Sequence, residues 1–395
     1  MPDTLPEKLC RITGIGQSEV GRPSPKSALE LTLDAATMAI ADAGLKIEDI
    51  DGVVNYPPKT DLGGGISPVG VSEAMFALGI DAKWVGSANH EGPGHMGAIF
   101  AAIMAVSTGL CRHVLVFRTV AQAQARLKSR DATLLAGTQR RVSGNNAWTV
   151  PFHAVSPANM WALYARAYFD KYGASEEQLG WVAVNARRNA AHNPNAIYRE
   201  RLTIEDYLAS RMISSPLRLY DCDTHIDGST ALIISHRDAA KDGRNAPIHI
   251  EAMGMALGGL GHGYHTGDFT SLPADKAGTM LWQRTDLKPK DVSCAQIYDG
   301  FSIHTWLWGE AMQLWPRGEA GAFWQGGTRV ALTGELPINT GGGQLSGGRF
   351  HGYGHTYEAC LQLWGRGGAR QVKDAKVSAV CNGGYGYGAL LLRVD

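Results

Sequence analysis

Two stretches of this chain follow the same plan, and this repetition limits the fold more than any other feature. Residues 43–50, Ala-Gly-Leu-Lys-Ile-Glu-Asp-Ile, resemble residues 286–292, Asp-Leu-Lys-Pro-Lys-Asp-Val. In both places a helix ends and the chain enters a buried strand that leads to a Gly-rich loop, a helix and another strand. The repetition predicts an α/β protein of two βαβ-rich halves related by duplication, each with a mostly parallel sheet between helices.

Hydrophobic periodicity and capping residues locate the individual elements. In the first half they predict strands near 9–19, 51–55, 83–86 and 113–117 and helices over 27–43 and 96–108. After residue 118 they predict helices over 156–172 and 176–195 and strands over 217–222 and 229–235. In the second half they predict helices from Ser302 and over 356–364 and a strand over 376–380.

The composition excludes several functional classes. A length of 395 residues suits two packed subdomains, and the formal net charge of zero argues against nucleic acid or an anionic membrane as the main partner. The six cysteines are scattered singly, so we expect neither a zinc site nor a disulfide framework. The sequence shows no signal peptide and no transmembrane segment, and the expected location is a reducing cytoplasm.

Three distant motifs carry the residue types that acid–base chemistry needs. The first is Tyr298-Asp299-Gly300-Phe301, at the end of a predicted strand. The second is the Gly-rich stretch 339–354, in which His351 and Tyr353 crowd the start of a helix. The third is Cys381-Asn-Gly-Gly384, where glycine amides can face an oxyanion. A phenol donates a proton or, beside a cation, accepts one.

The order and spacing of these motifs resemble the C-terminal half of the thiolase superfamily, and above all its lipid-transfer-protein (SCP2-thiolase-like) branch. The resemblance implies duplicated βαβ halves in a five-layered αβαβα architecture with an inserted loop domain. The N-terminal half would then span residues 1–247, with the loop domain at about 119–215, and the C-terminal half residues 248–395.

The chain departs from a thiolase at three places. The family tetrad begins with His and has Cys third, where this chain has Tyr298 and Gly300. The histidine of the family's Gly-His-Pro motif is replaced by Arg349. The loop that carries the acyl-accepting cysteine reads Asn-His-Glu-Gly-Pro-Gly over residues 89–94, so His90 or Glu91 is the acid or base that remains there. Cys381 matches the proton-shuttling cysteine of thiolases and is the best support for a rival thiolase assignment.

The Tyr-Asp-Gly-Phe form is similar to that of steroid side-chain aldolases, in which this tyrosine and a second one in the Gly-rich loop are catalytic. That resemblance places the second tyrosine at Tyr353, with His351 next. It implies retro-aldol cleavage of a β-hydroxyacyl-CoA without a cofactor beyond the coenzyme A of the substrate and without a metal. It further implies a homodimer within a heterotetramer that contains a DUF35 protein with an OB fold and a zinc ribbon.

The expected site therefore has two parts. The catalytic candidates are Tyr298, Tyr353, His351 and Asp299, and the candidates for holding the substrate or its oxyanion are Gly383, Gly384, Cys381, Arg349, Glu91 and His90. Two alternatives stay open. One is a thiolase that acts on a β-ketoacyl-CoA, and the other is a lipid or acyl-CoA carrier without catalysis.

Overall fold

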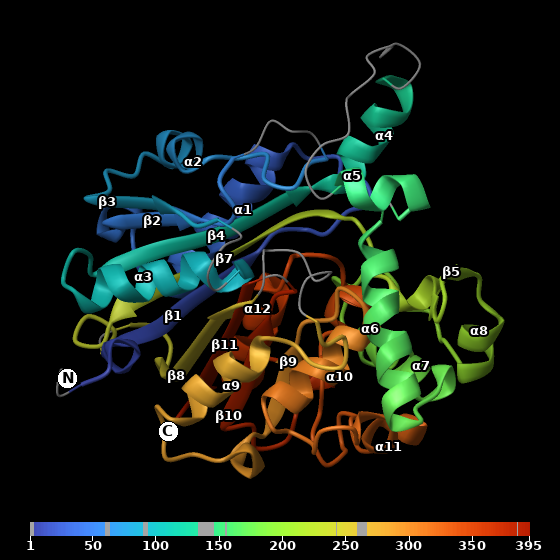
Figure 1. The fold of residues 1–395 in the computed structure, drawn as a ribbon. Helices are drawn as coiled ribbons and strands as arrows, with labels where there is room; N and C mark the ends of the chain where they lie inside the picture. Colours follow the sequence, from blue (N-terminus) through green and yellow to red (C-terminus); the bar gives the residue numbers. More distant parts are fainter. Residues whose placement is uncertain are drawn as a thin grey trace.

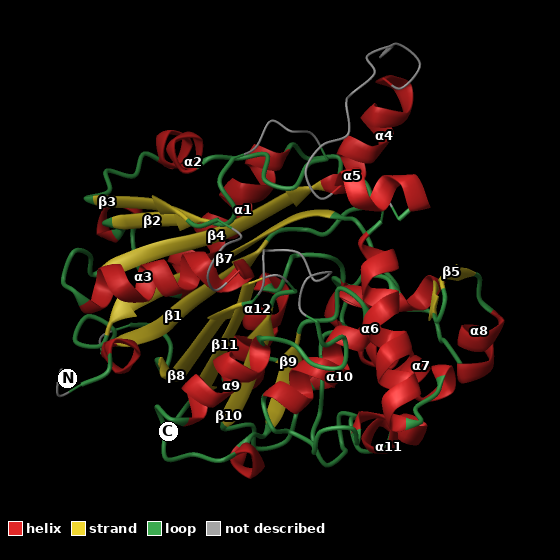
Figure 2. Ribbon diagram, viewed as in Figure 1, coloured by secondary structure: helices red, strands yellow, loops and turns green. Residues whose placement is uncertain are grey.

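The structure is a computed structural model that describes residues 4–59, 64–89, 94–132, 146–154, 156–241, 243–258, 267–384 and 386–395. Helices and strands alternate through these ranges, as Figure 1 and Figure 2 show. Within them no helix combines the length and the apolar character needed to cross a membrane.

Nine strands of the described chain form one mixed sheet in the order β3-β2-β4-β7-β1-β8-β11-β10-β9. Their bounds are β1 Cys10–Gln17, β2 Gly52–Asn55, β3 Trp84–Ser87, β4 His113–Ala121, β7 Asp227–His236, β8 Ile248–Leu257, β9 Cys294–Ile297, β10 Val377–Asn382 and β11 Gly386–Arg393. Two short strands, β5 Met212–Ser214 and β6 Leu217–Arg218, pair separately. The predicted strand over 217–222 is thus shorter, because a 3-10 turn begins at Leu219.

The strand pairing confirms the duplication. In the N-terminal half β2 pairs in parallel with β3 and β4, and β4–β7 and β7–β1 are antiparallel. In the C-terminal half β9 pairs in parallel with β10, and β10–β11 and β11–β8 are antiparallel. A single parallel bridge, Ala295 to Ile338, takes the place of the β2–β3 pair. Within the nine-stranded sheet formed by the described residues, the two halves are joined by β1 and β8, which pair at two residues of β1, Arg11 and Ile12.

The prediction of a mostly parallel sheet is wrong, because antiparallel pairs make up the inner part of each half. The reason is visible at β10 and β11, which are separated by only residues 383–385. A parallel pair needs a crossover of a dozen or more residues, so a connection this short forces the antiparallel arrangement.

Alternate strand residues face different cores, so each half of the sheet is covered on both sides. In the N-terminal half, Val53 lies in one outer core and Val54 in the middle core. In the C-terminal half, Leu391 lies in the other outer core and Leu390 in the middle core. The covering helices are α1 Ala28–Asp42 and α2 Val71–Leu78 on one outside, α3 Gly97–Ser107 and α12 Tyr353–Leu363 in the middle, and α9 Ala274–Trp282 and α10 Ser302–Ala311 on the other outside. This succession gives the predicted five-layered αβαβα arrangement (Figure 1).

Local sequence explains how α1 begins, ends and packs. Ser27 and Glu30 form a capping box at its start, and Gly44, with φ +74°, follows its end. Gly16 of β1 lies against α1, and a Cβ there would overlap the carbonyl oxygen of Ala35. The Gly-x-Gly of β1 therefore serves close helix–sheet packing.

The chain between β4 and β7 is mainly helical. It contains α4 Gln122–Ala132, α5 Asn146–Thr149, α6 Pro157–Tyr172, α7 Glu176–Ala190 and α8 Ile204–Ala209. Helix α7 ends before the predicted residue 195, because Pro194 disfavours helical backbone at Asn193. The rings of Tyr168 in α6 and Trp306 in α10 lie 5.4 Å apart, so this segment packs on the C-terminal half beside β9.

Candidate active site

The candidate residues come from strand ends and helix starts that the fold brings together. Tyr298 follows β9, Asn382 ends β10, Tyr353 begins α12, and His95 lies in the 3-10 turn Gly94–Met96 just before α3. The carboxyl ends of parallel strands and the start of the helices are where α/β proteins place ligand sites. All four side chains are buried.

His95 is the centre of an aromatic cluster made of Tyr56, His95, Tyr298, His351 and Tyr353. Its ring centroid lies 5.0 Å from that of Tyr298, and 5.4 Å from those of Tyr56 and His351. Tyr56 stacks on Tyr353 at 6.4 Å. The structure therefore joins Tyr298, Tyr353 and His351, three of the residues predicted from the sequence, in one cluster.

Asn382 fixes the tautomer of His95. The His95 Nδ1 lies 2.9 Å from the Asn382 Oδ1, while the Asn382 Nδ2 donates to the carbonyl of His351 at 3.3 Å. With its amide so oriented, the Asn382 Oδ1 accepts a hydrogen bond from the His95 Nδ1–H, and the neutral imidazole of His95 carries its lone pair at Nε2.

Burial controls the ionisation of both tyrosines. It raises the pKa of Tyr298 above the ordinary phenol value, and Asp223 raises this pKa further, whereas Arg349 opposes the shift. Burial likewise raises the pKa of Tyr353, against the effect of Arg118. Both side chains are therefore protonated phenols at neutral pH. The Tyr353 hydroxyl has no hydrogen-bond partner among the described residues.

Arg118 of β4 brings a buried cation to this cluster. Its guanidinium lies 5.6 Å from the centre of the Tyr56 ring, and its Nη2 lies 2.6 Å from the His351 Nδ1. Burial lowers the pKa of Arg118 to about 10, so the group keeps its charge at neutral pH. A phenolate at Tyr353 would be stabilised by this charge.

Arg349 forms an ion pair beside the cluster. Its Nε donates to Asp223 at 2.7 Å, its Nη2 donates to the same carboxylate, and its Nη1 lies 3.2 Å from the His225 Nε2. Burial and Arg349 lower the pKa of His225 to about 4, so His225 is neutral. In this structure the guanidinium of Arg349 is therefore held by Asp223, and it acts on Tyr298 through its charge.

Asp299 supports the Gly-rich loop. Its carboxylate accepts from the amides of Gln344 at 2.8 Å and Leu345 at 3.3 Å, and His355 Nε2 lies 3.0 Å from Oδ1. A Cβ on Gly343 would overlap this carboxylate. The contacts of Asp299 are those of a positioning residue that holds the loop leading to Tyr353.

Cys381 lies next to Tyr298, and Gly383 and Gly384 follow it after Asn382. The Cys381 carbonyl accepts the Tyr298 amide at 2.9 Å, and burial raises the pKa of the Cys381 thiol well above its ordinary value. The last ladder pair of β10 and β11 is Asn382 with Gly388, so the amides of Gly383 and Gly384 come after the ladder. Gly383 has φ +116°, a conformation that favours glycine.

Two of the predicted residues, His90 and Glu91, lie outside the described residues. Several cluster members were not predicted from the sequence. His95 directly follows the loop of residues 89–94, and Arg118 is a charged residue directly after the apolar run 113–117, which is a usable signal. Tyr56 follows β2, and Asn382 ends β10 within the Cys381-Asn-Gly-Gly384 motif, and neither has a pattern of its own.

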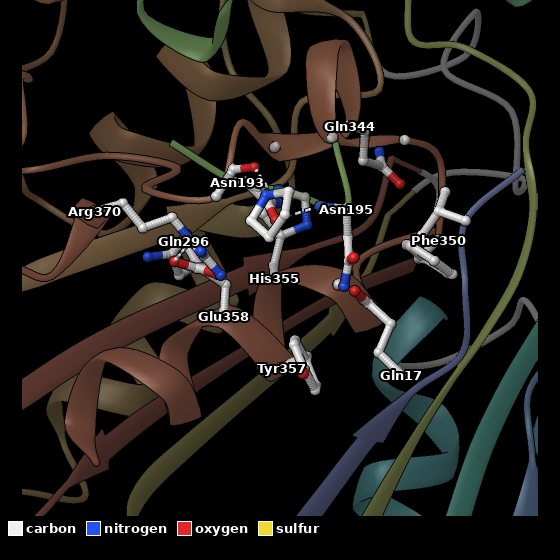
Figure 3. Close-up of a pocket in the computed structure, with 17 residues that line it drawn as sticks. Gln17, Asn193, Asn195, Gln296, Gln344, Phe350, His355, Tyr357, Glu358 and Arg370 are labelled. Carbon is white, nitrogen blue, oxygen red and sulfur yellow. Dashed lines mark hydrogen bonds and ion pairs between the residues drawn. The ribbon is translucent and has the colours of Figure 1, made fainter. Parts of the chain in front are cut away.

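A polar cavity has His355 among its lining residues, as Figure 3 shows. Its lining includes Asn193 of the helical segment together with Glu358 and Arg370, which form an ion pair at 3.0 Å. Neither Tyr298 nor Tyr353 lines this cavity. We therefore place the candidate active site at the aromatic cluster, where the acid–base groups gather.

The fold agrees with the comparisons to known proteins. Residues 262–390 match the family model for the thiolase C-terminal domain-like family. A steroid side-chain-cleaving aldolase from Thermomonospora curvata is 33% identical over 356 residues, which cover 88% of each chain. A 17-hydroxy-3-oxo-4-pregnene-20-carboxyl-CoA lyase from Mycobacterium tuberculosis is 32% identical, over 90% of this chain and 91% of its own length.

The chain belongs to the thiolase superfamily, in its SCP2-thiolase-like branch. Within that branch it is similar to the steroid side-chain-cleaving aldolases. The solved structure of an Ltp2-ChsH2(DUF35) aldolase superposes with a TM-score of 0.86 at 31% identity and covers 98% of both chains.

Proposed function

We propose that this protein is a carbon–carbon lyase that cleaves a β-hydroxyacyl-CoA by a retro-aldol reaction. The observation that carries the proposal is the pair of buried tyrosines, Tyr298 and Tyr353, joined through His95 and Tyr56 in one cluster. The similarity to relatives whose names describe a lyase and an aldolase supports the same class of reaction.

The chemistry needs one base and one acid. The base removes the proton of the β-hydroxyl, the Cα–Cβ bond breaks, and its electron pair forms the thioester enolate while the β-carbon becomes a carbonyl. The acid then protonates the α-carbon of the enolate. We assign the base to Tyr353, because Arg118 favours its phenolate, and the acid to Tyr298, because burial and Asp223 keep it protonated. The amides of Gly383 and Gly384 are the proposed donors to the enolate oxygen.

Cys381, which matches the proton-shuttling cysteine of thiolases, does not replace the missing acyl-accepting nucleophile of the competing thiolase reaction. Its thiol is fully buried, and burial raises its pKa, so thiolate is scarce at neutral pH. Retro-aldol cleavage needs no covalent enzyme intermediate, because the thioester itself accepts the electron pair. We propose His90 or Glu91, which lie outside the described residues, as a further acid or base of the reaction.

The proposed substrate is a bulky, apolar acyl group such as a steroid side chain on CoA, as in the names of the relatives. A DUF35 partner is proposed because the similar solved structure is that of an Ltp2-ChsH2(DUF35) aldolase. We also propose a homodimer through β3, which is the edge strand of the sheet. Val85 of β3 and Phe76 of α2 support this, because their side chains are 53% and 91% exposed there.

We propose that the chain divides into residues 1–247 and 248–395, with a loop domain at about 119–215. Support comes from the β1–β8 junction, which consists of two residue pairs and is the narrowest point of the sheet. The helical segment between β4 and β7 covers most of the proposed loop domain.

The test is a product analysis with the chain co-expressed with a DUF35 protein. A steroid β-hydroxyacyl-CoA supplied without free CoA should give a ketone and a shorter acyl-CoA. Cleavage of a β-ketoacyl-CoA that depends on added CoA, with no reaction of the β-hydroxy substrate, would instead identify a thiolase. Tight acyl-CoA binding with no product from either substrate would identify a carrier.

A further inference from the structure

His304 is a buried histidine of α10 that the proposed acid–base chemistry does not use. Its side chain is 2% exposed, and its Nδ1 accepts the amide of Phe301 at 3.0 Å. An Nδ1 that accepts an N–H carries no proton, so the neutral ring has its proton on Nε2. This Nε2 has no hydrogen-bond partner among the described residues. A buried donor without a partner is rare in native proteins and calls for an explanation.

The surroundings of His304 show where this donor points. A Cβ placed on Gly384 would lie 3.2 Å from the Nε2, so the donor borders the loop after β10. The ring centroid of Tyr298 lies 5.2 Å from that of His304, and the Trp161 ring meets the His304 ring edge-on at 3.8 Å. The donor therefore lies at the glycine loop after β10, close to the proposed acid and to an aromatic residue of α6.

We propose that His304 donates a hydrogen bond from Nε2 to the thioester oxygen of a bound acyl-CoA, and to the enolate oxygen as it forms. The inference rests on the proposed function in one respect, namely that the ligand is an acyl-CoA thioester. Its position beside Gly384 makes the imidazole one of several donors that converge on a single oxygen.

The charge state suits this role. Burial, with a smaller effect of His95, lowers the pKa of His304 to about 3, so the ring stays neutral through the physiological range. A neutral imidazole N–H holds an enolate oxygen without transferring its proton, which keeps the electron pair available for protonation at carbon.

Two substitutions of His304 distinguish the loss of its Nε2 donor from the loss of its contact with the Phe301 amide. In His304→Asn the amide oxygen takes the place of Nδ1 and keeps the bond to the Phe301 amide, but nothing reaches the place of Nε2. In His304→Gln the amide nitrogen takes the place of Nε2 and the donor is kept, while the bond to Phe301 is lost. If His304 only supports the local fold, His304→Asn should be the more active variant. If His304 donates a hydrogen bond to the ligand, His304→Gln should be the more active variant.

The direct readout is the infrared carbonyl stretch of a steroid acyl-CoA that lacks the β-hydroxyl, labelled with ¹³C at the thioester carbonyl. We expect binding to the wild-type complex to lower this frequency, the Gln variant to retain the shift, and the Asn variant to lose the part of the shift that His304 contributes. In turnover of the β-hydroxy substrate, the Asn variant should lose about 100-fold in kcat with little change in KM.

The outcomes separate the inference from the proposed function. A carbonyl shift that depends on His304 in a protein without lyase activity would overturn the function and leave the donor role intact. Lyase activity with equal shifts and equal kcat in wild type and His304→Asn would overturn the donor role alone. Binding to the wild type without any shift would also overturn the donor role, so the inference does not depend on the folding of either variant.

Discussion

The phenol oxygen of Tyr298 lies directly over the backbone of Gly300. A Cβ at position 300 would be 2.9 Å from this oxygen and 2.9 Å from the Cε1 of the ring. The two departures of the tetrad from the thiolase pattern, Tyr at the first position and Gly at the third, therefore belong together. The ring can occupy this place only because residue 300 has no side chain.

Replacing Gly300 with alanine should displace the Tyr298 ring and lower kcat. Contacts below 3.0 Å to a Cβ are essentially never tolerated, and a displaced general acid loses its alignment with the α-carbon. We expect a loss of about 100-fold in kcat, measured by product formation. Gly70→Ala is the matched control, because a Cβ there meets Lys59 at 3.4 Å, an ordinary contact. Equal activity in the two variants would show that Tyr298 has no role.

The Tyr353 base assignment predicts a pH dependence. Because burial raises the pKa of Tyr353, its phenolate is a minor species at neutral pH and grows about tenfold for each pH unit. Single-turnover cleavage should therefore accelerate with a slope near one between about pH 6 and pH 9. Tyr353→Phe should lose about 10²- to 10⁴-fold in rate and the slope with it, whereas Tyr172→Phe, in another part of the fold, should retain both. A slope that survives in Tyr353→Phe would assign the base to another group.

His304 should make the fold sensitive to acid. Its folded pKa of about 3 lies below the unfolded value, so the unfolded chain binds more protons between these limits. The free energy of unfolding should then fall as the pH drops below about 6.5, by about 1.4 kcal/mol per pH unit from this group. The free energy of unfolding, measured by denaturant titration at several pH values, should become more similar in the wild type and His304→Asn as the pH falls. For the exposed-site control His192→Asn, the difference from the wild type should stay constant with pH. If the difference in the free energy of unfolding between the wild type and His304→Asn did not change with pH, His304 would not be a buried neutral imidazole.

Asp299→Asn should weaken the Gly-rich loop while leaving the chemistry in place. The substitution keeps an acceptor for the Gln344 amide but removes the charge that faces His355. We expect a loss of about 1–3 kcal/mol in the free energy of unfolding and a lower kcat whose pH profile keeps its shape. A changed pH profile would show that Asp299 takes part in proton transfer.

Much of the fold follows from local sequence. The helix starts near residues 27 and 156 and the repeated order of elements were predicted from the sequence, and the structure contains them. The sheet directions did not follow, because strands such as β10 and β11 show the same apolar pattern whether they pair in parallel or not. The direction depends on how the short connection turns, and the pattern of apolar residues does not record it.

The site was predictable where a motif carries its own signal. Tyr298, Tyr353 and His351 were identified by motif, and they share a cluster. The contacts of Asp299 with the loop amides and of Arg349 with Asp223 could not be predicted, because only the folded chain brings these groups near each other. His95 and His304 were missed for the same reason, since a single histidine in a helix shows nothing of the long-range contacts that bury it.

The lyase assignment is tested most directly by a reaction in D₂O with a steroid β-hydroxyacyl-CoA and no free CoA. The quantity to measure is the deuterium content of the short acyl-CoA that is released. Retro-aldol cleavage predicts one deuterium at the α-carbon per turnover, placed there by the exchanged hydroxyl of Tyr298, and its rate should fall in Tyr298→Phe. An absence of cleavage by the complex until free CoA and a β-ketoacyl-CoA are supplied would contradict the lyase assignment.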